Sequence, residues 1–464
     1  MKQSKIYVLQ EKPLTSAIIN LSLPSVLSMM VSILYNLTDT FFIGKLNDPV
    51  LVAAVSISLP LFTFQMAIAG IFGNGGGSYL SRLLGRKDYQ GARETATTAI
   101  VTSGIVSIII AVGGTLLIPS FLRAVGASDQ TYQPAYNYMF WIMLGTPFIM
   151  LKFTLVQLLR AEGAAKAAMA GLMLGTGLNI VLDPLFIFVF NMSVTGAAVA
   201  TVIGQAIATG FFAYYYLSGH SIASPALRFL RFDLEIYKQI LFIGIPASLS
   251  QIMMGIGNMI SYRLGGYYSD LHVAALGVAS RVFSIPSFVF IGISVGVQPL
   301  IGFNYGAHNY PRMKKAIRQS ITICLWMSIF FLLLLIFFPV QILSAFTKEK
   351  DVITYGSSVL AAYIFVIPVM AMGMILMTSL QSMGKAFQAF IIAISRQGIV
   401  YIPLIFLLNA QLSFEGLVLA LPLADMITTS LSFAFVYHIL KNLKADKIIP
   451  PKDISMEEEV SLVG

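Results

Sequence analysis

Two carboxylates, Asp39 and Asp183, lie deep within long apolar runs of the chain. Placing an aspartate at the centre of a bilayer costs about 2.5–3.5 kcal/mol on insertion scales. Such a residue is retained where it pairs with another charge, binds a cation or carries a proton. The chemistry that these two residues indicate is therefore the reversible binding of H⁺ or of a hard cation such as Na⁺.

Polar side chains recur at helical spacing around both carboxylates and in the apolar run that follows Asp183. They are Tyr35 and Asn36 beside Asp39, Thr176 and Asn179 beside Asp183, and the pair Thr201 and Gln205. Residues at this spacing share one face of an α-helix. The resulting cluster of oxygen atoms can coordinate Na⁺ or share a proton, and either would neutralise the carboxylates. The cluster suits both ions equally. The alternative to an ion site is a structural cluster of polar side chains that only fixes helix packing.

Pro184 directly follows the second carboxylate. A proline disfavours helical geometry at the residue before it and removes a backbone donor. We therefore expect a kink at Asp183 whose geometry switches with the charge state of the carboxylate.

The elements that must hold these residues are membrane-spanning helices. Hydrophobic residues make up 57% of the chain and charged residues 11%, with a mean hydropathy of +0.83; a soluble domain carries about 25% charged residues. About twelve apolar segments reach the ~20 residues that a span needs, without the alternation of a barrel strand. The expected spans are 15–42, 50–78, 95–118, 134–158, 165–189, 194–217, 238–263, 273–302, 316–341, 353–380, 387–409 and 414–440.

Basic residues concentrate in alternate connections and near both ends of the chain. This asymmetry predicts that both termini are cytoplasmic, and it attributes the net charge of +9 to topology and anionic-lipid contact, without a nucleic-acid partner. A single cysteine, Cys324, excludes an internal disulfide or a cysteine-based metal cluster, and the four histidines lack ligand spacing. We expect no cofactor, and no metal beyond Na⁺.

The chain carries an internal duplication. Gly73–Gly85 resembles Ser294–Gly306, each followed by a short basic stretch, and further motifs match at the same offset of about 220 residues. Because six spans separate the copies, the halves should be parallel repeats related by an axis along the membrane normal. We expect lobes at 1–217 and 238–445, a cytoplasmic linker at 218–237 and a cytoplasmic tail at 446–464. Two bundles facing each other suit alternating access, which predicts a transporter.

This duplicated layout resembles the multidrug and toxic compound extrusion (MATE) family, most closely its MepA/DinF-like bacterial branch. The motifs that carry the resemblance are Ser22–Pro24, Tyr35–Gly44, Arg160–Gly163, Gly177–Pro184 and Gly196–Thr201. The resemblance implies an all-α integral membrane protein with twelve transmembrane helices in two six-helix bundles related by pseudo-twofold symmetry. It also implies a cation-coupling site at Asp39, Asn179, Asp183 and Thr201. Other branches carry acidic residues in their seventh, eighth or tenth spans, and this chain has none there.

The remaining buried charges are assigned less specific roles. Asp425 lies near the middle of the last span, and Arg281 and Arg396 are also deep, so we expect structural ion pairing between them ahead of proton coupling. Glu162 lies beside Arg160 and Lys166 at the end of the fourth span. It is predicted to form either a solvated ion pair at the membrane edge or part of a gate.

The substrate cavity is predicted from adaptable apolar and amide side chains in the second half. The candidates are Met253, Met254, Asn258, Tyr262, Gln298 and Gln397. The acidic interior of the first lobe would favour cationic compounds. The glycine-rich run Gly73–Ser78 lacks the Lys-Ser/Thr ending of a phosphate loop and fits close helix packing.

We therefore expect a cation-coupled (H⁺ or Na⁺) multidrug efflux antiporter, exporting amphipathic, often cationic, compounds from the bacterial cytoplasmic membrane. Its partners would be drug-like small molecules and membrane lipids, with the protein a monomer. The alternative is a flippase of lipid-linked or polysaccharide precursors, which would need a large cationic cavity. A membrane-embedded enzyme would need a nucleophile or metal set that the sequence does not show.

Overall fold

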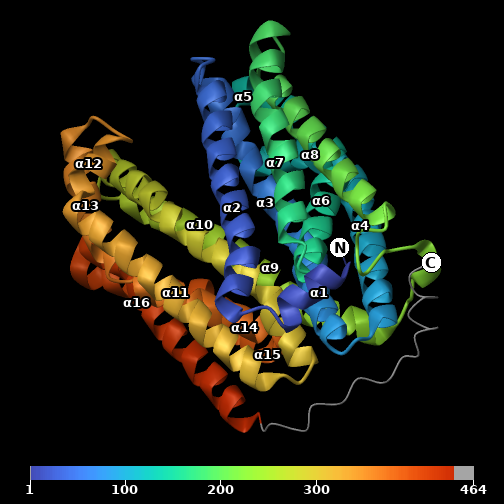
Figure 1. Cartoon of the computed structure of the whole chain (residues 1–464). Coiled ribbons are helices and arrows are strands. Elements are labelled where there is room, and N and C mark those ends of the chain that lie inside the picture. The colour runs from blue at the N-terminus through green and yellow to red at the C-terminus, as the bar shows by residue number, and fades with distance from the viewer. Residues whose placement is uncertain (1, 444–464) are drawn as a thin grey trace.

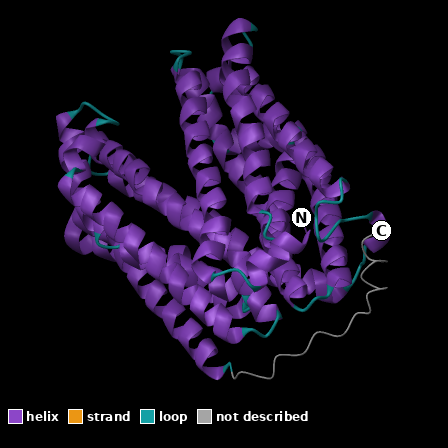
Figure 2. Ribbon diagram, viewed as in Figure 1, coloured by secondary structure: helices purple, strands orange, loops and turns teal. Residues whose placement is uncertain are grey.

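The computed structural model describes residues 2–443. The predicted tail at 446–464 lies outside these residues. All regular structure in the described part of the chain is helical, as Figure 2 shows. The helices of the first half are α1 (Lys2–Gln10), α2 (Leu14–Gly44), α3 (Pro49–Gly85), α4 (Tyr89–Ala124), α5 (Asp129–Leu144), α6 (Thr146–Ala161), α7 (Ala165–Pro184), the π-helix η1 (Leu185–Val189) and α8 (Ser193–Leu217).

A connecting segment with one short 3₁₀ turn, η2 (Leu227–Phe229), leads into the second half. The helices there are α9 (Leu234–Gly266), α10 (Asp270–Gly306), α11 (Tyr310–Phe337), α12 (Pro339–Ser344), α13 (Lys350–Ile364), α14 (Ile367–Ser382), α15 (Ala386–Ile394), the π-helix η3 (Ser395–Ile399) and α16 (Tyr401–Asn442).

The helices account for the twelve predicted spans. Within residues 2–443, nine helices are long and apolar enough to cross a membrane, and the bent pairs α5–α6 and α13–α14 raise this number to 11. The last of these helical stretches, Ala386–Asn442, runs for 57 residues and breaks at Ser413, where φ is 54° and ψ is −136°. This break divides it into the eleventh and twelfth spans. The predicted all-α fold is confirmed.

The duplication extends to the local geometry of the chain. Asp88 caps α4 by accepting from the backbone N–H of Gly91 at 2.8 Å, and its counterpart Asn309 caps α11. The bend between α5 and α6 is 49°, and that between α13 and α14 is 51°. Side-chain caps of this kind satisfy the free N–H groups of a helix start. The repeated motifs thus produce the same turns, caps and bends in both halves.

The two groups of helices diverge toward one end and meet at the other, where α3, α9 and α10 cross (Figure 1). Two glycines that correspond in the repeat make this contact. A Cβ on Gly85 would lie 2.0 Å from the carbonyl oxygen of Phe303, and a Cβ on Gly306 would lie 2.0 Å from that of Arg82. Only glycine permits so close an approach. The reciprocal contact is the one expected across a pseudo-twofold axis.

The same end of the molecule is joined by polar contacts between the halves. The Ser78 hydroxyl donates to the carbonyl of Gln381 at 2.5 Å, and the buried Arg82 guanidinium donates to Gln239 at 3.0 Å. Asn304 donates to the carbonyl of Leu9 at 3.1 Å. These hydrogen bonds and the glycine crossings close this end, which carries the basic turns after Gly85 and Gly306.

Candidate functional site

The polar cluster of the first bundle is built by α2, α7 and α8. α7 and α8 cross at Gly175 and Gly204, where a Cβ on either residue would lie 2.7 Å from the carbonyl oxygen of the other. This close approach places Asn179 of α7 against Thr201 of α8. The small residues therefore fix the spacing of the polar groups one turn further along each helix.

Hydrogen bonds connect most of the predicted residues. The Asn179 amide Nδ2 donates to Asp183 Oδ1 at 3.2 Å and to Thr201 Oγ1 at 3.4 Å. The Tyr35 hydroxyl lies 3.3 Å from Thr201 Oγ1. Asn179, Asp183 and Thr201 are buried, and Asp39 is close enough to Asp183 for their charges to interact. The structure thus brings together the four residues that the sequence assigned to cation coupling.

Four buried oxygen atoms around this cluster have no hydrogen-bond partner. They are Asp39 Oδ1, Asn179 Oδ1, Asp183 Oδ2 and Gln205 Oε1. A buried acceptor that lacks a partner costs roughly 1–3 kcal/mol, and more where it is charged. A hard cation coordinated by carboxylate and amide oxygens, or a proton on a carboxylate, would remove this cost. Within residues 2–443 there is no group of three or more His, Cys, Asp or Glu able to hold a transition metal.

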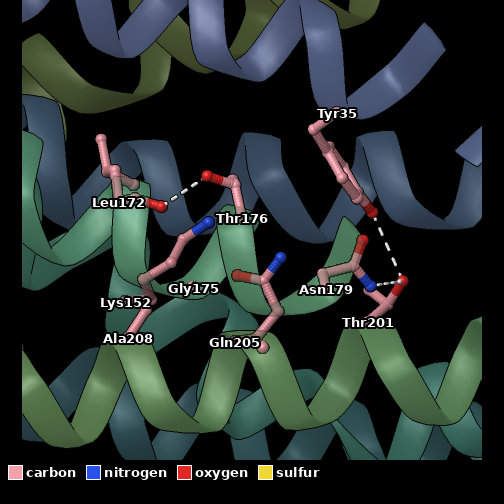
Figure 3. Close-up of a pocket in the computed structure, with 10 residues that line it drawn as sticks. Tyr35, Lys152, Leu172, Gly175, Thr176, Asn179, Thr201, Gln205 and Ala208 are labelled. Carbon is pink, nitrogen blue, oxygen red and sulfur yellow. Dashed lines mark hydrogen bonds between the residues drawn. The ribbon is translucent and has the colours of Figure 1, made fainter. Parts of the chain in front are cut away.

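A small cavity opens beside the cluster (Figure 3). Its polar lining comes from α2, α6, α7 and α8 and consists of Tyr35, Lys152, Thr176, Asn179, Thr201 and Gln205. Of these residues, sequence analysis missed Lys152, although a lysine within the span 134–158 was a signal. Asn36 does not join the cluster, because its side chain is exposed on α2.

The predicted substrate-contacting residues of the second half do not form one group. Gln397 is buried in η3 and approaches Gly257 of α9, and Met253 lies near Gly398. Gln298 of α10 instead lines a separate cavity with Asn74 and Gln157 of the first half. The side chains of Met254, Asn258 and Tyr262 are exposed along α9.

Asp425 is paired in the structure, but with only one of the two predicted arginines. The Arg396 guanidinium donates from Nε to Oδ1 at 2.6 Å and from Nη2 to Oδ2 at 3.1 Å, in a bidentate arrangement. Arg281 does not join this ion pair, because its side chain is exposed on α10. The expectation of a pair that includes Arg281 was wrong: α10 turns this position away from α16.

Glu162 occupies neither a solvated edge nor a pair with Arg160 or Lys166, so the predicted solvated ion pair was wrong, and the alternative role in a gate stays a prediction. Its side chain is fully buried and accepts from the Ser221 hydroxyl and from the backbone N–H groups of Ile222 and Ala223, the latter two at 2.9 and 3.2 Å. Lys5 of α1 lies 3.7 Å from its second oxygen. Glu162 therefore fastens the segment after α8 and the N-terminal helix to the end of α6.

These features define the class of protein. A duplicated set of membrane-spanning helices that meets at one end and encloses a polar cluster within one bundle has the architecture of a multi-pass transporter. The MatE family model matches residues 24–185 and 246–407, one segment in each half. The chain belongs to this family of transporters, and it is not an enzyme.

Similar proteins cover nearly the whole chain. The multidrug export protein MepA of Staphylococcus aureus (strain MSSA476) is 31% identical over 452 residues, which cover 96% of this chain and 98% of the relative. The Staphylococcus haemolyticus (strain JCSC1435) protein of the same name is 30% identical over 447 residues, with the same shares covered.

Solved structures agree with these relatives. A multidrug resistance MATE transporter in an outward-facing conformation matches with a TM-score of 0.90 and 26% identity, covering 95% of this chain and 98% of that one. A transporter from Pyrococcus furiosus, whose binding pocket is described as reversed in polarity, matches with a TM-score of 0.89 and 26% identity, covering 94% and 98%. The chain therefore has the fold of this family and the features of a multidrug efflux transporter.

Proposed function

We propose that this protein is a cation-coupled antiporter in which H⁺ or Na⁺ binds at Asp39, Asn179, Asp183 and Thr201. The observation that carries the proposal is the set of four buried oxygen atoms without partners, two of them on carboxylates. The amide N–H groups of Asn179 already donate to the other carboxylate oxygen of Asp183 and to Thr201. A cation or proton supplied from outside the membrane is the simplest group that satisfies the remaining acceptors.

Coupling requires that the cation and the exported compound favour different conformations. A ligand shifts an equilibrium only by its differential affinity for the two states. The coupling residues come from α2, α7 and α8, and α2 also crosses α10 of the other half at Gly292 and Gly296. Neutralising the carboxylates therefore acts on a helix that contacts both halves, which links cation binding to their relative position.

The orientation and the functional units follow from the charge distribution. We assign the closed end, with its basic turns, to the cytoplasm together with both termini, in a bacterial cytoplasmic membrane. Residues 1–217 and 238–445 act as the two lobes and 218–237 as the linker. The conformation in the structure is then closed to the cytoplasm, and amphipathic, often cationic, compounds would leave from the opposite, diverging end.

Transport in liposomes tests the coupling site. The purified protein is reconstituted, and export of a fluorescent cation such as ethidium is measured under a proton gradient and under a sodium gradient, each imposed separately. We expect one of the two gradients to drive transport in the wild type. Asp39→Asn and Asp183→Asn should each reduce this gradient-driven rate at least about 10-fold, because each removes a charge that the cation neutralises.

Asp129→Asn is the matched control, because Asp129 is exposed at the start of α5 in the same half. This variant should transport at the wild-type rate. Full gradient dependence in both Asp39→Asn and Asp183→Asn would exclude the proposed site, and the absence of gradient-driven movement in the wild type would exclude antiport.

A further inference from the structure

The connection between the two halves carries an exposed surface that helix packing does not explain. Within the Leu227–Leu234 segment, the side chains of Leu227, Phe232 and Leu234 are 77%, 80% and 82% exposed. Single exposed apolar side chains are common, whereas several within one short stretch indicate contact with a partner or a membrane. The two arginines of the segment, Arg228 and Arg231, are exposed as well.

The segment is fastened to the start of α4. The Thr98 hydroxyl donates to the carbonyl of Arg231 at 3.1 Å. The Thr97 hydroxyl accepts from the backbone N–H of Ala226, directly before the segment, at 3.3 Å. Arg231 Nε also lies 3.2 Å from Glu94. Because these contacts hold it at two places, the segment has a defined position on the first half.

This position is at the boundary of the membrane. Thr98 belongs to the candidate span α4, and the exposed apolar face of that helix begins at Ile105, about two turns further on. On α9, Leu234, Lys238 and Phe242 recur at intervals of four residues and are all exposed. They share one face of the helix, so the lipid-facing side of this span continues to the end of the segment. The segment therefore lies where two spans enter the membrane, on the side that we assign to the cytoplasm.

Guanidinium groups gather at this boundary. Arg231 pairs with Glu94, but its side chain remains 61% exposed. Arg228 has no carboxylate partner among residues 2–443, and its guanidinium lies 4.9 Å from the centre of the Phe229 ring. Arg93 of α4 approaches the same ring at 5.5 Å. Contact with an aromatic ring holds a guanidinium in place and leaves its N–H groups free to bind a phosphate.

The acidic side chains of this region are already engaged. Asp233 caps α9, because its Oδ1 accepts from the backbone N–H of Glu235 at 2.9 Å. Glu235 in turn lies 4.0 Å from Lys238. The segment thus combines exposed arginines with exposed leucine and phenylalanine side chains. This combination is typical of an interfacial anchor, whose apolar side chains enter the acyl boundary while its cations reach the headgroups.

We propose that the Leu227–Leu234 segment is a binding site for anionic phospholipid at the cytoplasmic face of the membrane. Arg228 and Arg231 bind the phosphate, and Phe232 and Leu234 pack among the acyl chains. Each arginine near an anionic membrane surface strengthens binding about 5-fold. Phosphatidylcholine carries the same phosphate without a net charge, so the site prefers phosphatidylglycerol. This inference does not depend on the coupling cation, and its test measures lipid binding without transport.

Tryptophan quenching measures lipid binding at the segment itself. A Phe232→Trp reporter is placed in the full-length protein, in which Trp141→Phe and Trp326→Phe remove the two native tryptophans. The protein is reconstituted in phosphatidylcholine with increasing fractions of brominated phosphatidylglycerol or, in parallel, of brominated phosphatidylcholine. Bromine atoms quench tryptophan only at short range. We expect half-maximal quenching at a fraction of the anionic lipid at least about 5-fold lower than that of the zwitterionic lipid.

Variants of the reporter protein isolate the charge. Arg228→Gln should reduce the preference for the anionic lipid about 5-fold, because it removes a cation that no carboxylate neutralises. Arg228→Lys should retain most of the preference. Arg123→Gln is the matched control, since it removes an exposed arginine at the opposite end of α4 and should leave the preference unchanged. Raising the salt concentration should weaken the preference, because exposed charges are screened.

Several results would overturn the assignment. Equal quenching by the two lipids would make the segment an ordinary lipid contact, and no quenching by either would place it in water. The same loss of preference in Arg123→Gln and Arg228→Gln would show an effect of net charge alone. Relief of quenching by millimolar inorganic phosphate would make this a site for free anions. Failure of the antiport proposal would leave all these values unchanged, because no gradient is imposed.

Discussion

At the scale of single residues, buried charges divide into those that are paired and those that are not. Glu162 accepts three hydrogen bonds and lies near Lys5, and Asp425 is bound by Arg396 at two points. By contrast, Asp39 and Asp183 each retain an oxygen without a partner. Paired charges stabilise one arrangement of helices, whereas unpaired ones are available for ligands. This difference distinguishes the residues that hold helices together from the residues of the candidate site.

Glu162→Gln should destabilise the protein by about 1–3 kcal/mol, because the neutral amide is a weaker acceptor for its three donors and leaves Lys5 without a charge partner. Thermal unfolding in detergent, followed by size-exclusion chromatography of heated samples, measures the change. Glu235→Gln is the control, since the Glu235–Lys238 pair is exposed and contributes at most about 1 kcal/mol. An unchanged midpoint for Glu162→Gln would contradict the anchoring role.

Asp425→Asn should lower stability while leaving the cation dependence of transport unchanged. The substitution leaves the Arg396 guanidinium without its charge partner, and breaking a buried pair costs about 3–5 kcal/mol. The measurement combines thermal unfolding with transport under separate proton and sodium gradients. A variant that unfolds normally but loses gradient dependence would instead place Asp425 in the coupling mechanism.

The position of a residue along a span was predictable from the sequence, whereas the neighbours of its side chain were not. The proximity of Asn179, Asp183 and Thr201 was predictable, because helical spacing places the first two on one face and singles out Thr201 on the next span, and the resemblance joins the three in one site. The contacts of Glu162 were not predictable, because the burial of a side chain on α6 depends on which neighbours that helix faces. The prediction that Arg281 pairs with Asp425 was wrong for the same reason. Depth along a span is readable from sequence, whereas rotation about the helix axis depends on packing.

At the scale of elements, the polar site depends on local departures from regular helix geometry. α7 ends at Pro184, immediately after Asp183, and continues as the π-helix η1. The close crossing of α7 and α8 depends on Gly175 and Gly204. The spans themselves were predictable from apolar length. The π-helices and the bends of α5–α6 and α13–α14 were not, because such breaks depend on contacts with neighbouring helices.

Pro184→Ala should slow transport and alter its dependence on the coupling cation, because it restores a backbone donor where α7 passes into η1. We expect the variant to fold, since an alanine is tolerated in a helix. Initial export rates at several concentrations of the driving cation provide the measurement. Wild-type rates and cation dependence would rule out a switching role for this kink.

Gly204→Ala should impair coupling without removing any polar group. The added Cβ would lie 2.7 Å from the Gly175 carbonyl oxygen and 3.2 Å from Asn179 Cβ, so α7 and α8 must separate. Separation would lengthen the Asn179–Thr201 contact, and overpacking of this kind costs about 1–3 kcal/mol. Gly210→Ala is a suitable control, because a Cβ there meets nothing within 4 Å. Equal coupling in the two variants would show that the crossing does not position the site.

At the scale of the whole molecule, the duplication places equivalent contacts in both halves at the closed end. Gly85 packs against Phe303, and Gly306 packs against Arg82, the residue that corresponds to Phe303 in the repeat. The two lobes are nevertheless chemically different. The first contains the carboxylates and Lys152, and the second contains the Arg396–Asp425 pair. Shared geometry thus supports the closed end, while the polar residues that the halves do not share place the proposed coupling site in the first half only.

Adding a side chain at either glycine should therefore open the closed end. In Gly85→Leu and in Gly306→Leu, the new Cβ would lie 2.0 Å from a carbonyl oxygen of the other half. The two halves therefore cannot remain in contact there. Because the contacts are reciprocal, we expect the two variants to have closely similar effects. Nitroxide labels on Lys87→Cys and Phe387→Cys, in different halves, report the separation by double electron–electron resonance. Gly113→Leu, with open space around its Cβ position, should retain the wild-type distance.

A wild-type distance in both Gly85→Leu and Gly306→Leu would mean that these crossings do not maintain the closure. An effect from only one of them would contradict the pseudo-twofold relation.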